Sequence, residues 1–283
     1  MLDEVLAWLD PRPGQIIVDG TLGGGGHTAA LAEHVGRDGL VVALDRDPAA
    51  RARAERSLAG KSIKLVDADY RELPEVLSQL EITAVDGIVL DLGLSSDQLA
   101  DVSRGFSFDA PGPLDLRFDP TVGEPAWELI QRLGETELAD LIYRYGEERH
   151  SRKIARRIVE RRTDKPIRTA GDLAALVRHA VPPSRGERID PATRTFQALR
   201  IAVNDELGAL GDALARYPGC LRAGGRLAVI SFHSLEDRMV KEAFRDDPRY
   251  QNLTRKPLRP SEVEVARNPR ARSAKMRVAA RAA

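Results

Sequence analysis

Cysteine is nearly absent from this sequence, since Cys220 is the only one in 283 residues. A single cysteine excludes a disulfide within the chain and a multi-cysteine metal site. The histidines at 34, 150 and 179 show no ligand spacing, so no metal is predicted. No run approaches 18 apolar residues, and the first ten, MLDEVLAWLD, lack the basic start and apolar stretch of a signal peptide. We therefore expect a cytoplasmic protein that contacts no membrane.

An excess of charge of either sign is also missing overall, because 43 Lys and Arg balance 43 Asp and Glu. Residues 1–143, however, hold 12 basic against 26 acidic residues, a net −14, and residues 144–283 hold 31 against 17, a net +14. Residues 144–168 carry ten basic and four acidic groups, and residues 249–283 carry ten and two. Such clusters are typical of nucleic-acid binders, although solvated helix faces are the alternative.

The first third of the chain alternates strand and helix patterns. Four short runs rich in β-branched residues each end in an acid: QIIVD (15–19), GLVVALD (39–45), SIKLVD (62–67) and DGIVLD (86–91). Helical patterns such as HTAALAEHV and PAARARAERSLA lie between them. This alternation predicts an α/β fold with a mostly parallel sheet and ligands at the carboxyl ends of its strands.

An insertion interrupts this pattern. The next strand, RLAVISF, spans 226–232 and follows Asp91 after 134 residues, far more than a crossover needs. We predict an inserted helical domain over 104–196, with 1–103 and 197–283 forming the sheet domain. It contains several helical patterns.

Two further elements are predicted near the end of the chain. One long helix over 191–217 returns from the insertion to the sheet. Residues 252–259 and 274–282 pair as an antiparallel hairpin at the edge of the sheet.

Four consecutive glycines follow the first predicted strand, in VDGTLGGGGHTAALAEHV (18–35). A glycine loop between a buried strand and a helix lets a ligand approach the backbone closely. Gly24, Gly26 and Ala29 fit G-x-G-x-x-A, and Asp45 lies about 20 residues on, where its carboxylate can accept from both ribose hydroxyls. The loop therefore indicates a nucleoside-containing cofactor, either a nicotinamide dinucleotide or S-adenosylmethionine; a purely structural turn is the alternative.

Three features favour S-adenosylmethionine. Asp19 stands immediately before the loop, where it can meet the ammonium of the methionine moiety. The antiparallel hairpin predicted at the end of the sheet suits methyltransferases. The fourth strand ends in DLGLSS (91–96), in the place where amino-group methyltransferases carry an acid, Asn or Ser before a short turn.

Longer motifs carry a resemblance over nearly the whole chain. They are GGGGHT (23–28), DLGLSSDQL (91–99), RGFSFDAPGPLDLRFD (104–119), GEERHSRKIARRI (146–158), PATRTFQALRIAVNDEL (191–207), ISFHSLEDRMVK (230–241) and NPRARSAKMRV (268–278). With them the sequence resembles the MraW family of bacterial 16S ribosomal RNA cytosine-N(4) methyltransferases. Members of that family usually begin several residues earlier, with a His-x-Pro-Val segment, so this sequence is expected to start at an internal methionine.

The resemblance implies a class I (Rossmann-like) S-adenosylmethionine-dependent methyltransferase with an inserted helical substrate domain. It implies methylation of the 4-amino group of a cytidine in the decoding region of 16S rRNA within the small ribosomal subunit. It also implies a set of cofactor contacts: Gly25, Gly26, His27, Asp45, Tyr70, Asp91 and Gln98. In this reading Tyr70, in DADYREL, lies against the adenine.

Two residues are candidates for catalysis because both follow strands at the ligand-binding edge. Asp91 could contact the cofactor first and the reacting amine second; its alternative is to cap the following turn. His233, in SFHSLEDR, could accept a proton or hydrogen-bond the base, or it could simply fix its loop.

Phosphate contacts are predicted mainly from a basic band at helical spacing. Its members are Arg152, Lys153, Arg156, Arg157, Arg161 and Arg162, with Arg194 and Arg200 as further RNA contacts. Arg267, Arg270, Arg272 and Lys275 could add to it. Arg194, Arg200 and Asn204 either contact RNA or order the chain where the insertion ends.

Two other functions stay open from the residues alone. A nicotinamide-dependent oxidoreductase would use the same glycine loop, and a non-catalytic RNA-binding protein would explain the charge. The sequence leaves open the exact nucleotide, whether free RNA or the assembled subunit is the substrate, and whether the chain is a monomer or a homodimer.

Overall fold

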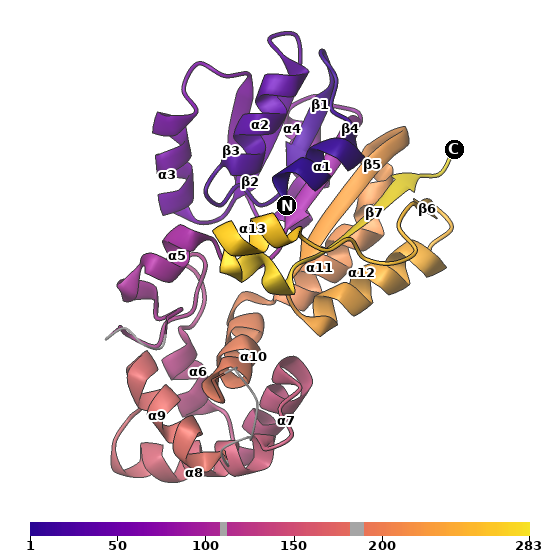
Figure 1. Ribbon diagram of the computed structural model, residues 1–283. Coiled ribbons are helices and arrows are strands. Elements are labelled where there is room, and N and C mark those ends of the chain that lie inside the picture. Colours follow the sequence, from indigo (N-terminus) through magenta and orange to yellow (C-terminus); the bar gives the residue numbers. More distant parts are fainter. Residues whose placement is uncertain (108–111, 182–189) are drawn as a thin grey trace. The chain divides into compact units, whose positions relative to one another are not determined.

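Two units make up the chain, and the second is inserted into the first (Figure 1). The computed structural model describes residues 1–107, 112–181 and 190–283. The first unit comprises Met1–Leu94 and Leu207–Ala283, and the second comprises Ser95–Glu206. The second unit is thus wider at both ends than the 104–196 insertion of the sequence prediction.

A seven-stranded sheet lies at the centre of the first unit, in the order β3-β2-β1-β4-β5-β7-β6. Its strands are β1 (Ile16–Asp19), β2 (Leu40–Asp45), β3 (Ile63–Asp67), β4 (Val85–Asp91), β5 (Leu221–Ser231), β6 (Tyr250–Asn252) and β7 (Lys275–Arg281). The first five strands run parallel, and β7 pairs antiparallel with both β5 and β6. This mostly parallel sheet with its antiparallel C-terminal strands confirms the predicted α/β class I fold.

Helices cover both faces of this sheet, which is why its inner strands are apolar on both sides. In β2, Val41 and Ala43 face α1 (Leu2–Leu9), α2 (Gly26–Val35) and α3 (Pro48–Ser57). Val42 and Leu44 face the other layer, which is made of α4 (Leu73–Gln79), α11 (Glu206–Arg216) and α12 (Ser234–Asp246). Successive side chains of a strand point to opposite faces, so one apolar run supplies both cores.

The second unit is helical. Its helices are α5 (Ser96–Ala100), α6 (Ala126–Arg132), α7 (Glu135–Gly146), α8 (Ser151–Asp164), α9 (Ala170–Ala180) and α10 (Ala192–Asn204). Helix α7 packs against α8 and α10, and α9 packs against the same two helices. Within the part of the chain that the structure describes, no helix is both long and apolar enough to cross a bilayer.

The single long helix predicted over 191–217 was wrong, because the structure breaks it at Asp205. Helix α10 ends at Asn204, Asp205 takes a left-handed conformation with φ of 50°, and α11 starts at the next residue. The Asn204 side chain turns away to bind a distant loop of the second unit. The helical period of the apolar residues continues across Asp205, so the sequence pattern does not reveal the break.

The hairpin prediction was right in direction and wrong in extent. Strand β6 covers Tyr250–Asn252 rather than 252–259. Beyond it, the Leu253 N–H donates to the Val278 carbonyl at 3.0 Å, and Leu258 forms an isolated bridge with Met276. Pro257 and Pro260 flank this bridge, and proline has no N–H to donate to a ladder. The segment therefore follows β7 without forming a continuous strand.

Candidate functional site

Four aspartates end the first four strands of the sheet. Asp19, Asp45, Asp67 and Asp91 are the last residues of β1, β2, β3 and β4. The register places Asp45 opposite Asp67 and Asp19 opposite Ala43, so these side chains share the carboxyl edge. An edge with this many carboxylates suits a ligand that carries positive charge.

The glycine loop leaves this edge open to a ligand. Gly25 has a φ of 77°, in the left-handed region that favours glycine. A Cβ atom placed on Gly24 or Gly26 would meet nothing within 4 Å, whereas one on Gly20 would lie 2.4 Å from Leu90 Cδ2. Gly20 thus allows β1 and β4 to approach closely, and the later glycines leave room beside the backbone.

Two threonines that the sequence analysis did not single out tie the loop to the strands. The Thr21 hydroxyl accepts the Asp91 backbone N–H at 2.6 Å. The Thr28 hydroxyl donates to Asp19 Oδ2 at 2.6 Å, and the Thr21 N–H donates to Asp19 Oδ1 at 3.1 Å. Asp19 is fully buried, so its carboxylate orders the loop. The sequence offered one hint of this role, which is the position of the two threonines. One directly follows Asp-Gly, and the other stands in the first turn of the helix.

The Asp45 carboxylate is fixed by backbone donors on both oxygens. The Gly23 N–H donates to Oδ2 at 2.9 Å, and the Asp47 N–H donates to Oδ1 at 2.8 Å. Burial is the larger influence and raises the pKa of Asp45, while these hydrogen bonds lower it. The glycine loop and the end of β2 are therefore held to one another through this side chain.

Asp91 presents two different oxygens. Oδ2 lies 3.6 Å from His27 Nδ1, in the first turn of α2. A third of the side chain is exposed, yet Oδ1 is buried and has no hydrogen-bond partner among the described residues. Burial raises the pKa of Asp91 to about 6, and the nearby His27 partly offsets this rise. A buried carboxylate oxygen without a partner is costly unless a ligand supplies one.

Tyr70 and Gln98, both predicted cofactor contacts, belong to different units. Tyr70 opens a 3₁₀ turn, η1 (Tyr70–Glu72), and its Cβ would lie 3.2 Å from a Cβ on Gly20, at the start of the glycine loop. Gln98 lies in α5 of the second unit, where its Oε1 accepts the Ser95 N–H at 3.0 Å. The structure therefore places Tyr70 beside the glycine loop and gives Gln98 a capping contact.

His233 caps the helix that follows β5. Its Nδ1 accepts the Glu236 N–H at 3.4 Å, and its Nε2 lies 3.1 Å from Glu236 Oε1. The histidine side chain is only 8% exposed. These contacts match the loop-fixing alternative, and a proton-accepting role stays a prediction.

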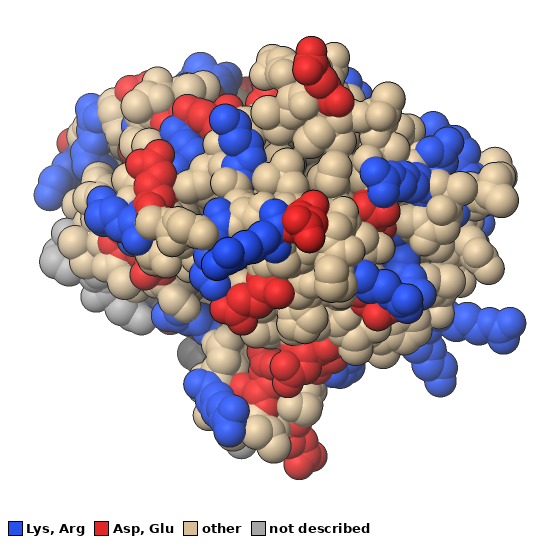
Figure 2. Space-filling view, turned by 90° about the horizontal axis from the view of Figure 1, so that it is seen from above, with Lys and Arg blue, Asp and Glu red and all other residues tan. Residues whose placement is uncertain are grey.

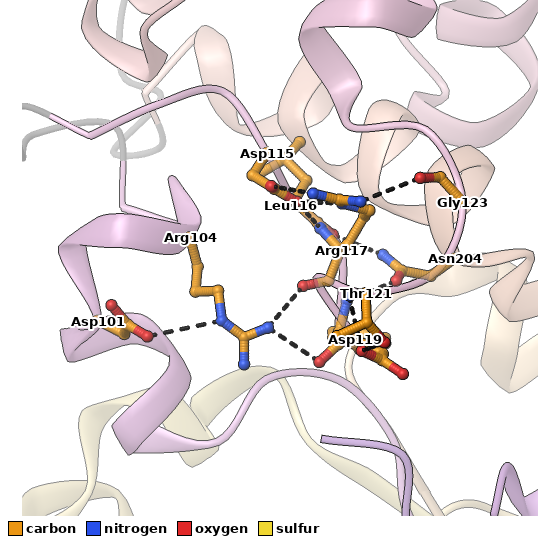
Figure 3. Close-up of polar contacts among 10 residues, drawn as sticks. Asp101, Arg104, Asp115, Leu116, Arg117, Asp119, Thr121, Gly123 and Asn204 are labelled. Carbon is orange, nitrogen blue, oxygen red and sulfur yellow. Dashed lines mark hydrogen bonds and ion pairs between the residues drawn. The ribbon is translucent and has the colours of Figure 1, made fainter. Parts of the chain in front are cut away.

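A strained loop over residues 115–119 of the second unit is held by several polar contacts (Figure 3). Leu116 is buried and has a φ of 66°, which costs a leucine roughly 1–3 kcal/mol. The Arg104 guanidinium donates to the Phe118 carbonyl at 2.9 Å and to the preceding carbonyl at 3.1 Å. Asn204 accepts the Phe118 N–H at 2.8 Å and donates to the Leu116 carbonyl at 2.7 Å. These two side chains hold the strained backbone.

The same loop accounts for much of the motif RGFSFDAPGPLDLRFD. Arg117 makes a two-pronged contact with Asp115, at 2.8 and 2.7 Å, and donates to the Gly123 carbonyl at 3.0 Å. The ring centres of Phe106 and Phe118 are 5.8 Å apart. Residues 108–111 of the motif lie outside the described residues.

Helix α8 carries most of the predicted phosphate contacts. Figure 2 shows basic and acidic side chains interspersed over one face of the molecule. Helix α8 is less mixed, because Ile154, Ala155 and Ile158 are buried and its other face is basic. Five of the predicted residues are exposed there: Arg152, Lys153, Arg156, Arg157 and Arg161. We call these five the α8 basic face; within it, Arg156 and Arg157 share Glu160, at 3.8 and 3.0 Å.

The other predicted arginines of the second unit, Arg162, Arg194 and Arg200, have partners inside it. Arg162 donates to the carbonyls of Ile130 and Leu133 at the end of α6. Arg194 lies 3.8 Å from Glu148 and is 45% exposed. The Arg200 side chain is 13% exposed, and its guanidinium contacts both Glu206 oxygens, at 2.7 and 2.9 Å. The structure thus gives Arg162 and Arg200 internal roles.

Comparison with known proteins identifies the family. The model of the MraW methylase family matches residues 1–282. The chain belongs to the MraW methylase family. It is 52% identical to ribosomal RNA small subunit methyltransferase H of Rhodopirellula baltica over 292 residues, which cover 99% of this chain and 90% of the relative. The protein of the same name from Deinococcus radiodurans is 52% identical over 281 residues, with coverage of 99% and 88%.

S-adenosylmethionine is the cofactor of this methylase, as predicted. The residues at the carboxyl edge fit it. Gly24 and Gly26 leave open space beside the backbone, and the buried Asp91 Oδ1 lacks a partner among the described residues. Several carboxylates face the edge, which suits a cofactor with a sulfonium and an ammonium group. We propose that Gly25, Gly26, His27, Asp45, Tyr70 and Asp91 hold it; a cofactor contact of Gln98 stays a prediction from the resemblance.

Proposed function

We propose that this methylase transfers a methyl group to the exocyclic 4-amino group of a cytidine in the decoding region of 16S ribosomal RNA. Support for an RNA substrate comes from the relatives, which are named as methyltransferases of small-subunit ribosomal RNA. Support for an amino-group acceptor comes from Asp91, and this residue carries the proposal. Its Oδ1 is a buried hydrogen-bond acceptor without a partner among the described residues, and a donor group of a ligand would supply that partner.

A cytosine amino group needs help because its lone pair is delocalised into the ring. As the nitrogen becomes tetrahedral, its N–H groups become stronger donors and need a fixed acceptor. Asp91 provides one, and a pKa of about 6 leaves most of this carboxylate ionised at pH 7. Thr21 binds the Asp91 backbone, so the carboxylate does not have to reorganise during the reaction. When bound, S-adenosylmethionine supplies the methyl group on its sulfonium.

The other residues at the carboxyl edge bind and orient the cofactor. Asp45, fixed by two backbone donors, would accept from the ribose hydroxyls of the bound cofactor, and Tyr70, beside the glycine loop, would hold its adenine. Asp91 serves the cofactor first and the amine second. The target cytidine has to be unpaired or turned outward to reach such a site.

The RNA is bound in part by the α8 basic face. Replacing Arg152 and Lys153, which have no partner among the described residues, with glutamine is expected to weaken binding to 16S rRNA by about tenfold at 0.15 M salt. The slope of log K against log salt is expected to fall by about 1.5, since two phosphate contacts are lost. Filter binding over a salt series measures both quantities. The variant R37Q/R56Q, which removes two exposed arginines at the amino edge of the sheet, is the control. Equal loss in both variants would contradict a role for α8.

Methyl transfer from labelled S-adenosylmethionine tests the function itself. Small ribosomal subunits and protein-free 16S rRNA, both lacking the modification, serve as substrates, and nucleosides are analysed by mass spectrometry after digestion. We expect 4-methylcytidine, with Asp45→Asn as the inactive control. A 5-methylcytidine or 2′-O-methyl product would disprove the amino-group acceptor, although the protein would still be a methylase. Comparing the two substrates shows whether the assembled subunit is required.

Neither alternative function gains support from the structure or the family. A nicotinamide-dependent oxidoreductase would not belong to a family of methylases. A non-catalytic RNA-binding protein would not need the unpartnered Asp91 oxygen.

A further inference from the structure

The segment between Leu258 and Lys275 leaves the sheet and returns to it at the carboxyl edge of the first unit. Leu258 bridges to Met276, Met276 pairs with Ile230, and Ile230 pairs with Asp91. These four residues therefore form one row across the sheet. Lys275, where the segment returns, pairs with Ser231 at the very end of β5. Residues 259–274 are thus an excursion of the chain beyond the edge that carries Asp91.

The excursion is anchored by small side chains. It contains α13 (Glu262–Arg267) and η4 (Pro269–Ser273), which pack against each other. Ala271 and Ala274 are 5% and 1% exposed, and Ala274 joins the core of α1 and α2. Their burial fixes the backbone, so the side chains between them point outward.

Three arginines of the excursion are exposed and unpaired. Arg259, Arg267 and Arg272 make no side-chain hydrogen bond or ion pair with any residue that the structure describes. Arg37 and Arg56 are also exposed without such a partner among the described residues, but they lie at the amino edge of the sheet. The three arginines of the excursion lie beyond the carboxyl edge that carries Asp91, where an RNA substrate has to approach.

We propose that Arg259, Arg267 and Arg272 bind the RNA phosphate backbone beside the methyl-transfer site. This inference rests on the proposed function and adds a second RNA contact, on the first unit, to the α8 basic face. Leu258 lies three strands from Asp91, about 14 Å at the usual strand spacing. Guanidinium groups suit phosphate because their donors match two oxygens at once. The phosphates held are therefore those close to the target nucleotide.

The test compares R267Q/R272Q with R37Q/R56Q. The control pair consists of exposed arginines at the amino edge, one before β2 and one before β3, so both variants lose the same charge. We expect R267Q/R272Q to weaken binding to 16S rRNA by about tenfold and to lower the salt slope by about 1.5. Its affinity for S-adenosylmethionine, measured by calorimetry, stays that of the unaltered chain. R267K/R272K keeps the charge and should restore most of the binding.

Two outcomes separate this inference from the proposed function. If the unaltered chain binds and methylates RNA while R267Q/R272Q binds it as tightly as R37Q/R56Q does, the excursion does not contact phosphate. If the unaltered chain neither binds nor methylates RNA, the proposed function fails and the inference with it. A loss of methyl transfer in R267Q/R272Q with unchanged RNA affinity also overturns the phosphate contact, because it would place the effect after binding.

Discussion

Replacing Asp91 with asparagine is expected to lower kcat/KM for methyl transfer by about 10²–10³-fold while the fold is retained. Asparagine has nearly the same shape, so the backbone contact with Thr21 survives. The negative charge and one acceptor oxygen are lost at a buried position. Part of the loss should appear as weaker cofactor binding, about tenfold by calorimetry, because a charge-assisted hydrogen bond is removed. The rest should remain at saturating cofactor, in single-turnover assays.

The pH dependence follows from the same carboxyl group. The pKa of Asp91 is raised to about 6, so its ionised form appears as pH rises through that value. Methyl transfer by the unaltered chain should therefore increase from pH 5 to pH 7 and then level, and D91N should lack this step. The effect of rising pH on the stability of the fold has the opposite sign. The folded chain holds this proton more tightly than the unfolded chain, whose pKa is near 3.8, so the contribution of Asp91 to the free energy of unfolding falls between about pH 4 and pH 6.

Asp38→Asn is the matched control, because Asp38 is exposed before β2 at the other end of the sheet. It should keep both the rate and the pH step. Full activity in D91N at pH 7, with the step unchanged, would show that another group accepts from the amine. His233 would then be the next candidate, through H233Q.

Replacing Asn204 with alanine is expected to destabilise the second unit by about 2–5 kcal/mol. The Phe118 N–H and the Leu116 carbonyl would both lose their side-chain partner in a buried place. Leu116 already has a strained backbone, and of the two side chains that bind the backbone of residues 116–118 across the loop, Arg104 would remain (Figure 3). Hydrogen exchange of peptides that cover residues 115–119 measures the effect, since the amide of Phe118 should lose its protection.

Asn204→Asp separates the two hydrogen bonds. An aspartate keeps an acceptor for the Phe118 N–H and loses the donor to the Leu116 carbonyl. We expect protection of the Phe118 amide to persist in N204D and to vanish in N204A. Equal protection in the unaltered chain and in N204A would show that Arg104 alone fixes the loop.

The strands and their ligand-binding edge could be predicted from local pattern. Each run such as GLVVALD is short, β-branched and ended by an acid, and the structure ends β2 at that same Asp45. Parallel strands align their carboxyl ends, so a list of strand ends is already a list of residues near a ligand. The glycine loop and Asp91 could be predicted in this way.

The roles of the arginines could not be predicted in this way. The residue type gives the charge, but it does not say which group the charge contacts. Arg152 and Arg162 look alike in the sequence of α8, yet one is exposed and the other binds the carbonyls at the end of α6. A shift of a few residues around a helix decides which face a side chain takes. Arg200 likewise has an internal partner, because Glu206 lies close enough to pair with it, and its contact with RNA stays a prediction.

By itself the sequence determined the α/β class, the inserted helical segment, the acidic edge and the glycine loop, because each depends on periodicity or on spacing along one stretch of chain. Only the tertiary structure decided that α10 ends at Asn204, that Leu116 is strained, and which Asp91 oxygen lacks a partner. The physical reason is the range of the interactions. Asn204 and Leu116 are 88 residues apart, and a hydrogen bond over that separation leaves no mark on the local pattern.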